Sequence, residues 1–194
     1  MKLSFSTKGW HGRSFDEFCT VAAELGYQGV EIHNIHGSMF TNRDGAFYDY
    51  TAAATLRRLY EQKITVSCVD ALTDPSDAAT ADAAETEIRR CMEVATNLHI
   101  PFVRLRTASA DEESAPAAIE NTVAVIARVL PEAESRGVTL LMETSGLFCR
   151  SAVLRDVLDR FASDAFGALW QLSAAYFGGG EDAETVIKNL GAYV

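Results

Sequence analysis

The chain has 194 residues, of which 48% are hydrophobic and 23% are charged, a composition typical of one soluble globular domain. Its formal net charge of -10 repels nucleic-acid phosphates at long range, which disfavours a nucleic-acid partner. No apolar run approaches the roughly 18 residues of a membrane span, and the first residues, MKLSFSTKGW, lack the apolar stretch of a signal peptide, so we expect a cytoplasmic protein without a membrane partner.

Segments typical of strands and helices alternate along the chain. The first expected strand, residues 2–7, precedes a helix over 14–27, in which Ser14 is the N-cap and Glu17 completes a capping box. A strand over 28–34 and a helix over 49–63, capped by Asp49 or Thr51, come next. The remaining expected elements are the strand 64–72, helix 74–99, strand 100–108, helix 114–137, strand 138–146, helix 151–163, strand 166–174, helix 182–191 and the start of a further strand at 192–194.

Strict alternation of strands and helices predicts an α/β fold with parallel strands and right-handed crossovers. An open doubly wound sheet and a (β/α)8 barrel both fit this order. Each expected strand has one apolar face and one largely polar face, because alternate residues of a strand share a face. The polar faces are Ser4, Ser6 and Lys8; Glu31 and His33; Thr65 and Ser67, opposite Val66 and Cys68; Arg104 and Arg106; Thr139, Glu143 and Ser145; and Gln171 and Ser173.

A doubly wound sheet buries both faces under helices, whereas a barrel opens its inner face to a pocket at the carboxyl end of the strands. The repeated polar face therefore favours a TIM-barrel type fold with about six of its eight β/α units. The alternative is an open sheet in which some strands are half exposed. We expect residues 1–194 to form a single domain that lacks the last two strands of the barrel.

Polar groups near the carboxyl ends of the expected strands suit a small polyhydroxylated or anionic ligand. Carboxylates hold a hard cation or move protons, and Lys and Arg bind carboxylates, phosphates or an enediolate. The candidates are Lys8, Glu31, His33, Arg104, Arg106, Glu143 and Gln171. Trp10 lies just past the first strand. Asp70 lies near the end of the third strand, after the polar-face residues Thr65 and Ser67.

Some of these residues also have a purely structural interpretation. Glu31 and Arg104 could form an ion pair inside the barrel, and Trp10 could either cover a sugar face or pack. Glu143 is the sharpest single candidate, since a lone carboxylate between apolar neighbours is costly unless it meets a cation or a proton donor.

The four cysteines have no CxxC spacing, which argues against a structural zinc site. We expect reduced thiols packed in or near the core. Cys149 follows a strand end and is the one expected to be exposed.

Several ordered segments resemble the sugar phosphate isomerase/epimerase superfamily, the xylose isomerase-like TIM barrels also called the AP endonuclease family 2 barrel. These segments are GYQGVEIH, a strand ending in Arg, GVTLLMETSG, GALWQLSAAYF and ETVIKNLGAYV, and the resemblance covers the whole chain. It implies a divalent metal (Mn, Mg, Zn or Co) held by a Glu, an Asp, a His and a Glu at the ends of strands five to eight. The two Glu residues of the family also move a proton between sugar carbons through an enediolate.

The resemblance implies roles for individual residues of this chain. Glu143 matches the first metal ligand and acid–base residue, and Trp170 matches the family's strand-six pattern, which is similar to W-D-x-x-H. Gln171 stands at the Asp position, where it could coordinate a metal only through an uncharged carbonyl, so metal affinity should fall sharply. Ala174 stands where a His usually contacts the substrate, and Tyr176 matches the family.

The resemblance therefore implies a sugar or sugar-phosphate isomerase/epimerase-like protein, and we expect little or no activity from this chain. The alternative is a non-catalytic sugar-binding or assembly module of the same fold. The open edges of a six-unit barrel should be covered by a second copy, so we expect a homo-oligomer. An AP endonuclease would need several metal ligands, and the acidic charge argues against it.

Overall fold

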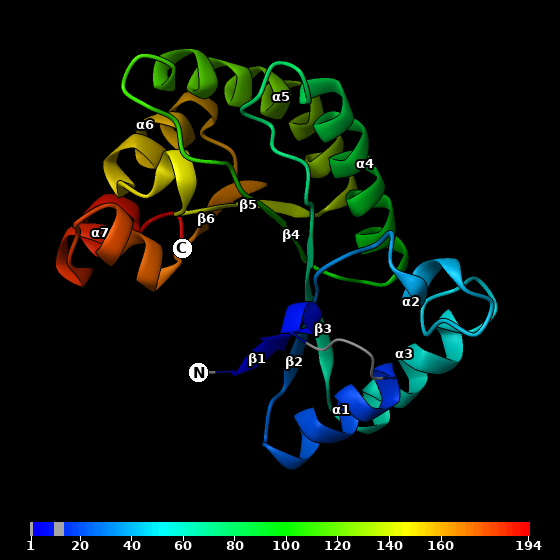
Figure 1. Cartoon of the computed structure of the whole chain (residues 1–194). Coiled ribbons are helices and arrows are strands. Elements are labelled where there is room, and N and C mark those ends of the chain that lie inside the picture. The colour runs from blue at the N-terminus through cyan, green and yellow to red at the C-terminus, as the bar shows by residue number, and fades with distance from the viewer. Residues whose placement is uncertain (1, 10–13) are drawn as a thin grey trace.

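The computed structural model describes residues 2–9 and 14–194, and its strands form one parallel sheet in the order β1-β2-β3-β4-β5-β6 (Figure 1). The order follows the chain, as in a barrel and not as in a doubly wound sheet, where the order reverses. This confirms the predicted TIM-barrel type fold with six β/α units. The strands are β1 Ser4–Ser6, β2 Gly29–Ile32, β3 Thr65–Asp70, β4 Phe102–Leu105, β5 Thr139–Glu143 and β6 Phe166–Leu169.

The helices lie on the outer side of the sheet in an arc that is open between α7 and α1 (Figure 1). They are α1 Phe15–Glu24, α2 Ser38–Thr41, α3 Ala52–Glu61, α4 Ala81–Asn97, α5 Ala115–Arg136, α6 Ser151–Phe161 and α7 Ala183–Leu190. The short α2 was not expected from the sequence. In the described part of the chain, no helix combines the length and the apolar composition that crossing a membrane requires.

The core lies between the sheet and this arc of helices. The strand residues that face the helices are almost entirely inaccessible to solvent: Val30, Ile32, Val69, Val103, Leu105, Leu140 and Met142. Their partners on the helices include Phe18, Ile88, Met92, Ile126 and Leu154. Burial of this apolar surface is the main stabilising term and leaves the opposite face of the sheet for polar side chains.

The helix ends show which capping predictions hold. Ser14 accepts a hydrogen bond from the Glu17 N–H and Glu17 caps the Ser14 backbone in return, so the predicted capping box is confirmed. Neither expected residue caps α3 with its side chain. Thr51 occupies the N-cap position, but its hydroxyl donates to the carbonyls of Gly45 and Tyr48.

A β-bulge changes which residues of β3 face inward. Val30 pairs with Val66, but the next residue of β2, Glu31, pairs with Cys68. Ser67 is the extra residue, and the alternation of faces reverses after it. The prediction that placed Cys68 on the apolar face with Val66 is therefore wrong.

All six strands are shorter than expected, and the early ends of β1 and β6 change how the site candidates Lys8 and Gln171 are placed. β1 ends at Ser6, and Lys8 lies in a 3-10 turn over Thr7–Gly9, so strand alternation does not place it. β6 ends at Leu169, and the chain then turns into a π-helix over Ala174–Gly178, so Gln171 lies beyond the strand.

The last residues run beside β6. The Tyr193 carbonyl accepts a hydrogen bond of 2.8 Å from the Ala168 N–H, although residues 191–193 form turns and not the strand start expected at 192–194. This contact lies on the side of β6 opposite β5.

Candidate functional site

Arg104 occupies the centre of the inner face at the carboxyl end of the sheet. Its Nη1 lies 3.0 Å from Glu31 Oε2, and its Nε lies 2.6 Å from Glu143 Oε2. Asp70 Oδ1 lies 3.8 Å from the same Nε. The Nε and the Glu143 oxygen form a close ion pair without the alignment of a hydrogen bond. One guanidinium thus lies among three carboxylates, from β2, β3 and β5.

The register of the sheet explains why these side chains meet. Asp70 pairs with Arg104 across β3 and β4, and Glu31 lies on the same face through its pairing with Cys68. Glu143 is the last residue of β5 and is 4% exposed. Paired residues of a parallel sheet point to the same face, so all four side chains converge at its carboxyl end.

His33, just past β2, is held from two sides. Its backbone N–H donates to Thr7 Oγ1 at 3.0 Å, and its Nδ1 lies 2.6 Å from Asp70 Oδ2. Burial raises the pKa of the Asp70 carboxyl, although Arg104, Arg106 and the His33 hydrogen bond act in the opposite direction. Arg106 follows β4, and its Nη2 lies 4.0 Å from the same Asp70 oxygen.

Ser6 extends the site toward β1. Its hydroxyl donates to Glu31 Oε1 at 2.6 Å and accepts from the Lys8 N–H at 3.1 Å. The Lys8 backbone is therefore tied to the site, while its side chain is exposed. We call Ser6, Glu31, His33, Asp70, Arg104, Arg106 and Glu143 the polar cluster.

Gln171 forms hydrogen bonds within the turn that follows β6. Its side-chain oxygen accepts hydrogen bonds from the Ala174 N–H at 2.5 Å and from the Ser173 hydroxyl at 2.9 Å. Its backbone N–H donates to Thr144 Oγ1 at 2.8 Å. A role as a metal ligand would require this side chain to leave the turn that it caps.

The structure thus brings together Glu31, His33, Arg104, Arg106 and Glu143 at the carboxyl end of the sheet, and their roles stay a prediction. It leaves Lys8 exposed and Gln171 in a turn, and Trp10 lies outside the described residues. The role of Asp70 at the centre was not predicted, since the alternation of β3 gave no sign of the bulge that turns it inward.

The residues described here do not fit the divalent metal of the resembled family. Among them, no group of three or more His, Cys, Asp and Glu side chains is arranged to hold a metal ion. The three carboxylates that do converge surround the Arg104 guanidinium, which supplies the positive charge that a metal would supply.

The cysteines do not add a nucleophile to the site. Cys19, Cys68 and Cys91 are buried free thiols, as expected, and Cys149 is partly exposed. Burial, with a smaller contribution from Glu31, raises the pKa of the Cys68 thiol to about 12. This thiol stays protonated at neutral pH and is a poor nucleophile.

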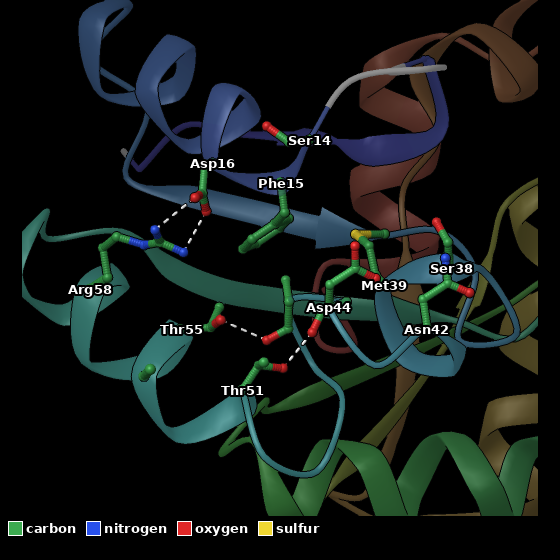
Figure 2. Close-up of a pocket in the computed structure, with 13 residues that line it drawn as sticks. Ser14, Phe15, Asp16, Ser38, Met39, Asn42, Asp44, Thr51, Thr55 and Arg58 are labelled. Carbon is green, nitrogen blue, oxygen red and sulfur yellow. Dashed lines mark hydrogen bonds and ion pairs between the residues drawn. The ribbon is translucent and has the colours of Figure 1, made fainter.

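A separate cavity of about 400 Å³ lies between α1, α3 and the segment that contains α2 (Figure 2). Figure 2 shows the Arg58–Asp16 ion pair on one side of this cavity. It also shows Thr55, which lies on α3, and Thr51, which is the N-cap residue of α3. None of the polar-cluster residues lines this cavity. It belongs to the helical layer and not to the inner face of the sheet.

Comparison with known proteins points to a single family. Residues 19–193 match the family model described as the xylose isomerase-like TIM barrel. A search of curated protein sequences finds no significant match.

Three solved structures show the same fold at low sequence identity. The probable 3-DHS dehydratase AsbF of Bacillus anthracis, involved in petrobactin synthesis, is 14% identical with a TM-score of 0.80 over 100% of this chain and 71% of that chain. The 3-keto-D-glucoside 4-epimerase YcjR of E. coli is 11% identical with a TM-score of 0.79 over 100% of this chain and 76% of that chain. The IOLI protein with a binding zinc atom is 16% identical with a TM-score of 0.69 over 87% of this chain and 62% of that chain.

Proposed function

Since the chain belongs to the xylose isomerase-like TIM-barrel family, we propose that its polar cluster binds a sugar or a sugar phosphate. We further propose that the metal-dependent isomerase or epimerase activity of this chain is weak or absent. The cluster lies at the carboxyl end of the strands, where barrels of this type bind their ligands.

The chemistry of the cluster supports a hydroxylated ligand. Glu143 Oε2 faces Arg104, and Oε1 has no hydrogen-bond partner among the described residues, so it is free to accept from a hydroxyl group. Arg106 is about one quarter exposed and has only a 4.0 Å contact with Asp70, which leaves its N–H groups available to a carbonyl or phosphate oxygen.

The ion pair between Arg104 and Glu143 supports the proposal that isomerase or epimerase activity is weak or absent. The resemblance assigns the proton-transferring carboxylate to Glu143, and here a guanidinium contacts it at 2.6 Å. The carboxylate oxygen that faces Arg104 thus has a guanidinium, and not a metal ion, as its counter-charge. The substitution of the expected Asp by Gln171 removes a charged metal ligand as well.

Binding and turnover can be measured separately. Saturation-transfer NMR with D-fructose and D-fructose 6-phosphate should detect binding, and Arg106→Gln should weaken the phosphorylated ligand more than the neutral one. Arg155→Gln on the exposed surface of α6 is the matched control and should leave binding unchanged. Product formation should stay at background with Mn²⁺, Mg²⁺, Zn²⁺ or Co²⁺. Absence of binding would refute the ligand site, and measurable metal-dependent turnover would refute the predicted inactivity.

Exposed apolar side chains favour an assembly module as the second candidate. Leu172, Tyr176 and Phe177 are all more than 60% exposed in the segment that follows β6. Exposed apolar side chains close together in one segment are typical of an interaction surface. The corresponding test concerns the oligomeric state and is given in the Discussion.

A further inference from the structure

His33 and Asp70 form a pair that the metal chemistry of the family does not account for. The His33 Nδ1 and Asp70 Oδ2 atoms are 2.6 Å apart, and the Asp70 side chain is completely buried. The His33 side chain is 22% exposed and borders the solvent. One member of the pair is thus fixed inside the protein, and the other reaches the open side of the cluster.

The backbone makes this arrangement possible through the bulge at Ser67. Without the extra residue, Asp70 would point to the helices with Val66, and Val69 would take its place on the inner face. Bulges are often found next to functional sites, where they redirect a side chain. Here the bulge places the Asp70 carboxylate next to the ring of His33.

The short contact favours one tautomer of the neutral imidazole. An ionised Asp70 carboxylate accepts the Nδ1–H, which leaves the lone pair on Nε2. Among the described residues, Nε2 has no hydrogen-bond partner. The charged groups around the pair are Glu31 on β2, Arg104 on β4 and Arg106 just after β4.

The surroundings of His33 and Glu143 differ. Glu143 contacts the Arg104 cation directly, whereas the His33 ring contacts the Asp70 carboxylate through Nδ1, and its Nε2 has no hydrogen-bond partner among the described residues. A base oriented by a buried acid through its other nitrogen is the arrangement used by many proton-transfer sites.

We propose that His33 is a metal-independent general base of this site and that Asp70 is the residue that positions it. His33 Nε2 takes a proton from the carbon next to the carbonyl group of a bound ketose. The C–H bond breaks, an N–H bond forms at Nε2, and the electron pair moves onto the carbonyl oxygen. Arg106 supplies the adjacent positive charge for that oxygen, and return of the proton restores the ketose. The inference rests on the proposed function for the position of the ligand.

The first test needs no ligand. In ¹⁵N-resolved NMR spectra, neutral His33 should carry its proton on Nδ1, and Asp70→Asn should favour the other tautomer, because the Asn amide can donate to Nδ1. A neutral His33 with its proton on Nε2 in the unsubstituted protein would overturn the proposal whether or not a sugar binds.

The second test measures proton exchange in D₂O with D-erythrulose, an open-chain ketose, in the presence of EDTA. The protein should accelerate replacement of the hydrogens next to the carbonyl by deuterium. His33→Gln should lower the rate about 100-fold or more, and added imidazole should partly rescue His33→Ala. His99→Asn, in an exposed turn where the backbone φ is 56°, is the control and should leave the rate unchanged.

The outcomes separate the two proposals. If the ketose binds but does not exchange, or if His33→Gln exchanges at the normal rate, the general-base role is wrong while the ligand site stands. If the ketose does not bind, the ligand site fails and the role of His33 fails with it.

Discussion

The side chain of Arg104 is only 14% exposed, yet it faces three carboxylates, of which Asp70 and Glu143 are buried. Transfer of these charges from water is costly, and their mutual attraction offsets the cost only while the cation is present. The polar cluster is therefore held together by one residue from the middle of the sheet. Its loss should affect folding before it affects any ligand.

Arg104→Met should lower the free energy of unfolding by about 3–5 kcal/mol, because it leaves buried carboxylates without a counter-charge. Urea denaturation followed by circular dichroism would measure the change. Arg58→Met is the matched control, since Arg58 pairs with Asp16 on the exposed surface and such pairs contribute about 0–1 kcal/mol. Equal effects of the two substitutions would show that the cluster is not electrostatically stabilised.

The same substitution tests whether Arg104 takes the place of a cation. Once the guanidinium is removed, Glu31, Asp70 and Glu143 form a set of oxygen ligands with excess negative charge. Mn²⁺ should therefore raise the melting temperature of Arg104→Met and leave that of the unsubstituted protein unchanged. A comparable rise in both proteins would contradict the replacement of a metal by Arg104.

At the level of elements, alternation and strand ends were enough to predict much of the site. Glu31 lies on the polar face of β2, and His33, just past the end of β2, continues the same alternation. Glu143 lies on the polar face of β5. These positions could therefore be predicted from the sequence. The inward position of Asp70 could not be predicted, because a bulge depends on how two strands pair and not on either strand alone. The side-chain bonds of Gln171 were missed because β6 ends two residues earlier, at Leu169.

Gly29 allows β1 and β3 to contact each other across β2. Ser4 Oγ and Ser67 Oγ are 3.0 Å apart, and a Cβ on Gly29 would lie 3.0 Å from the Ser4 hydroxyl oxygen. Gly29→Ala should therefore separate the two serines and cost about 1–3 kcal/mol of stability in urea denaturation. Gly9→Ala is the control, since a Cβ there meets no atom of the described residues within 4 Å. An unchanged denaturation midpoint in Gly29→Ala would show that the strands adjust freely.

The N-terminus of α7 depends on an ionised cap. Asp182 accepts a hydrogen bond of 2.8 Å from the Thr185 N–H, and its hydrogen bonds to Thr185 lower the pKa of its carboxyl below the usual 3.8. A lowered folded-state pKa contributes stability above the unfolded-state pKa, and this contribution is lost as the pH falls through the folded-state value. Asp182→Ala should therefore lower the melting temperature at pH 7, and the difference should shrink below about pH 4.

Asp182→Asn separates the charge from the hydrogen bond, because Asn also accepts from the helix backbone. Asp182→Asn should therefore have a melting temperature close to that of the unsubstituted protein at pH 7. Its melting temperature should depend less on pH in the acid range. A difference between Asp182→Ala and the unsubstituted protein that stays constant from pH 7 to pH 3 would contradict an ionised cap.

At the scale of the whole molecule, the parallel sheet pairs each strand with its chain neighbours, so β1 and β6 each have a strand partner on one side among the described residues. The helical arc stays open between α7 and α1 (Figure 1). The alternation of strands and helices alone also fits a doubly wound sheet, and it was the polar face repeated on all six strands that favoured the barrel order. Closure of the sheet is a property of the assembled molecule and depends on what covers the two edges.

We expect the protein to self-associate through the apolar segment that follows β6, which contains Leu172, Tyr176 and Phe177. The rings of Tyr176 and Phe177 are 5.0 Å apart, and the Phe177 side chain is 83% exposed. Burial of such a ring pair in an interface gains apolar contact without disturbing the core. Sedimentation velocity over a range of concentrations should show an oligomer, and Phe177→Asp should shift it toward the monomer. Tyr60→Asp, at an equally exposed position on α3, is the control and should not. A concentration-independent monomer would contradict the expectation, and equal effects of both substitutions would place the interface elsewhere.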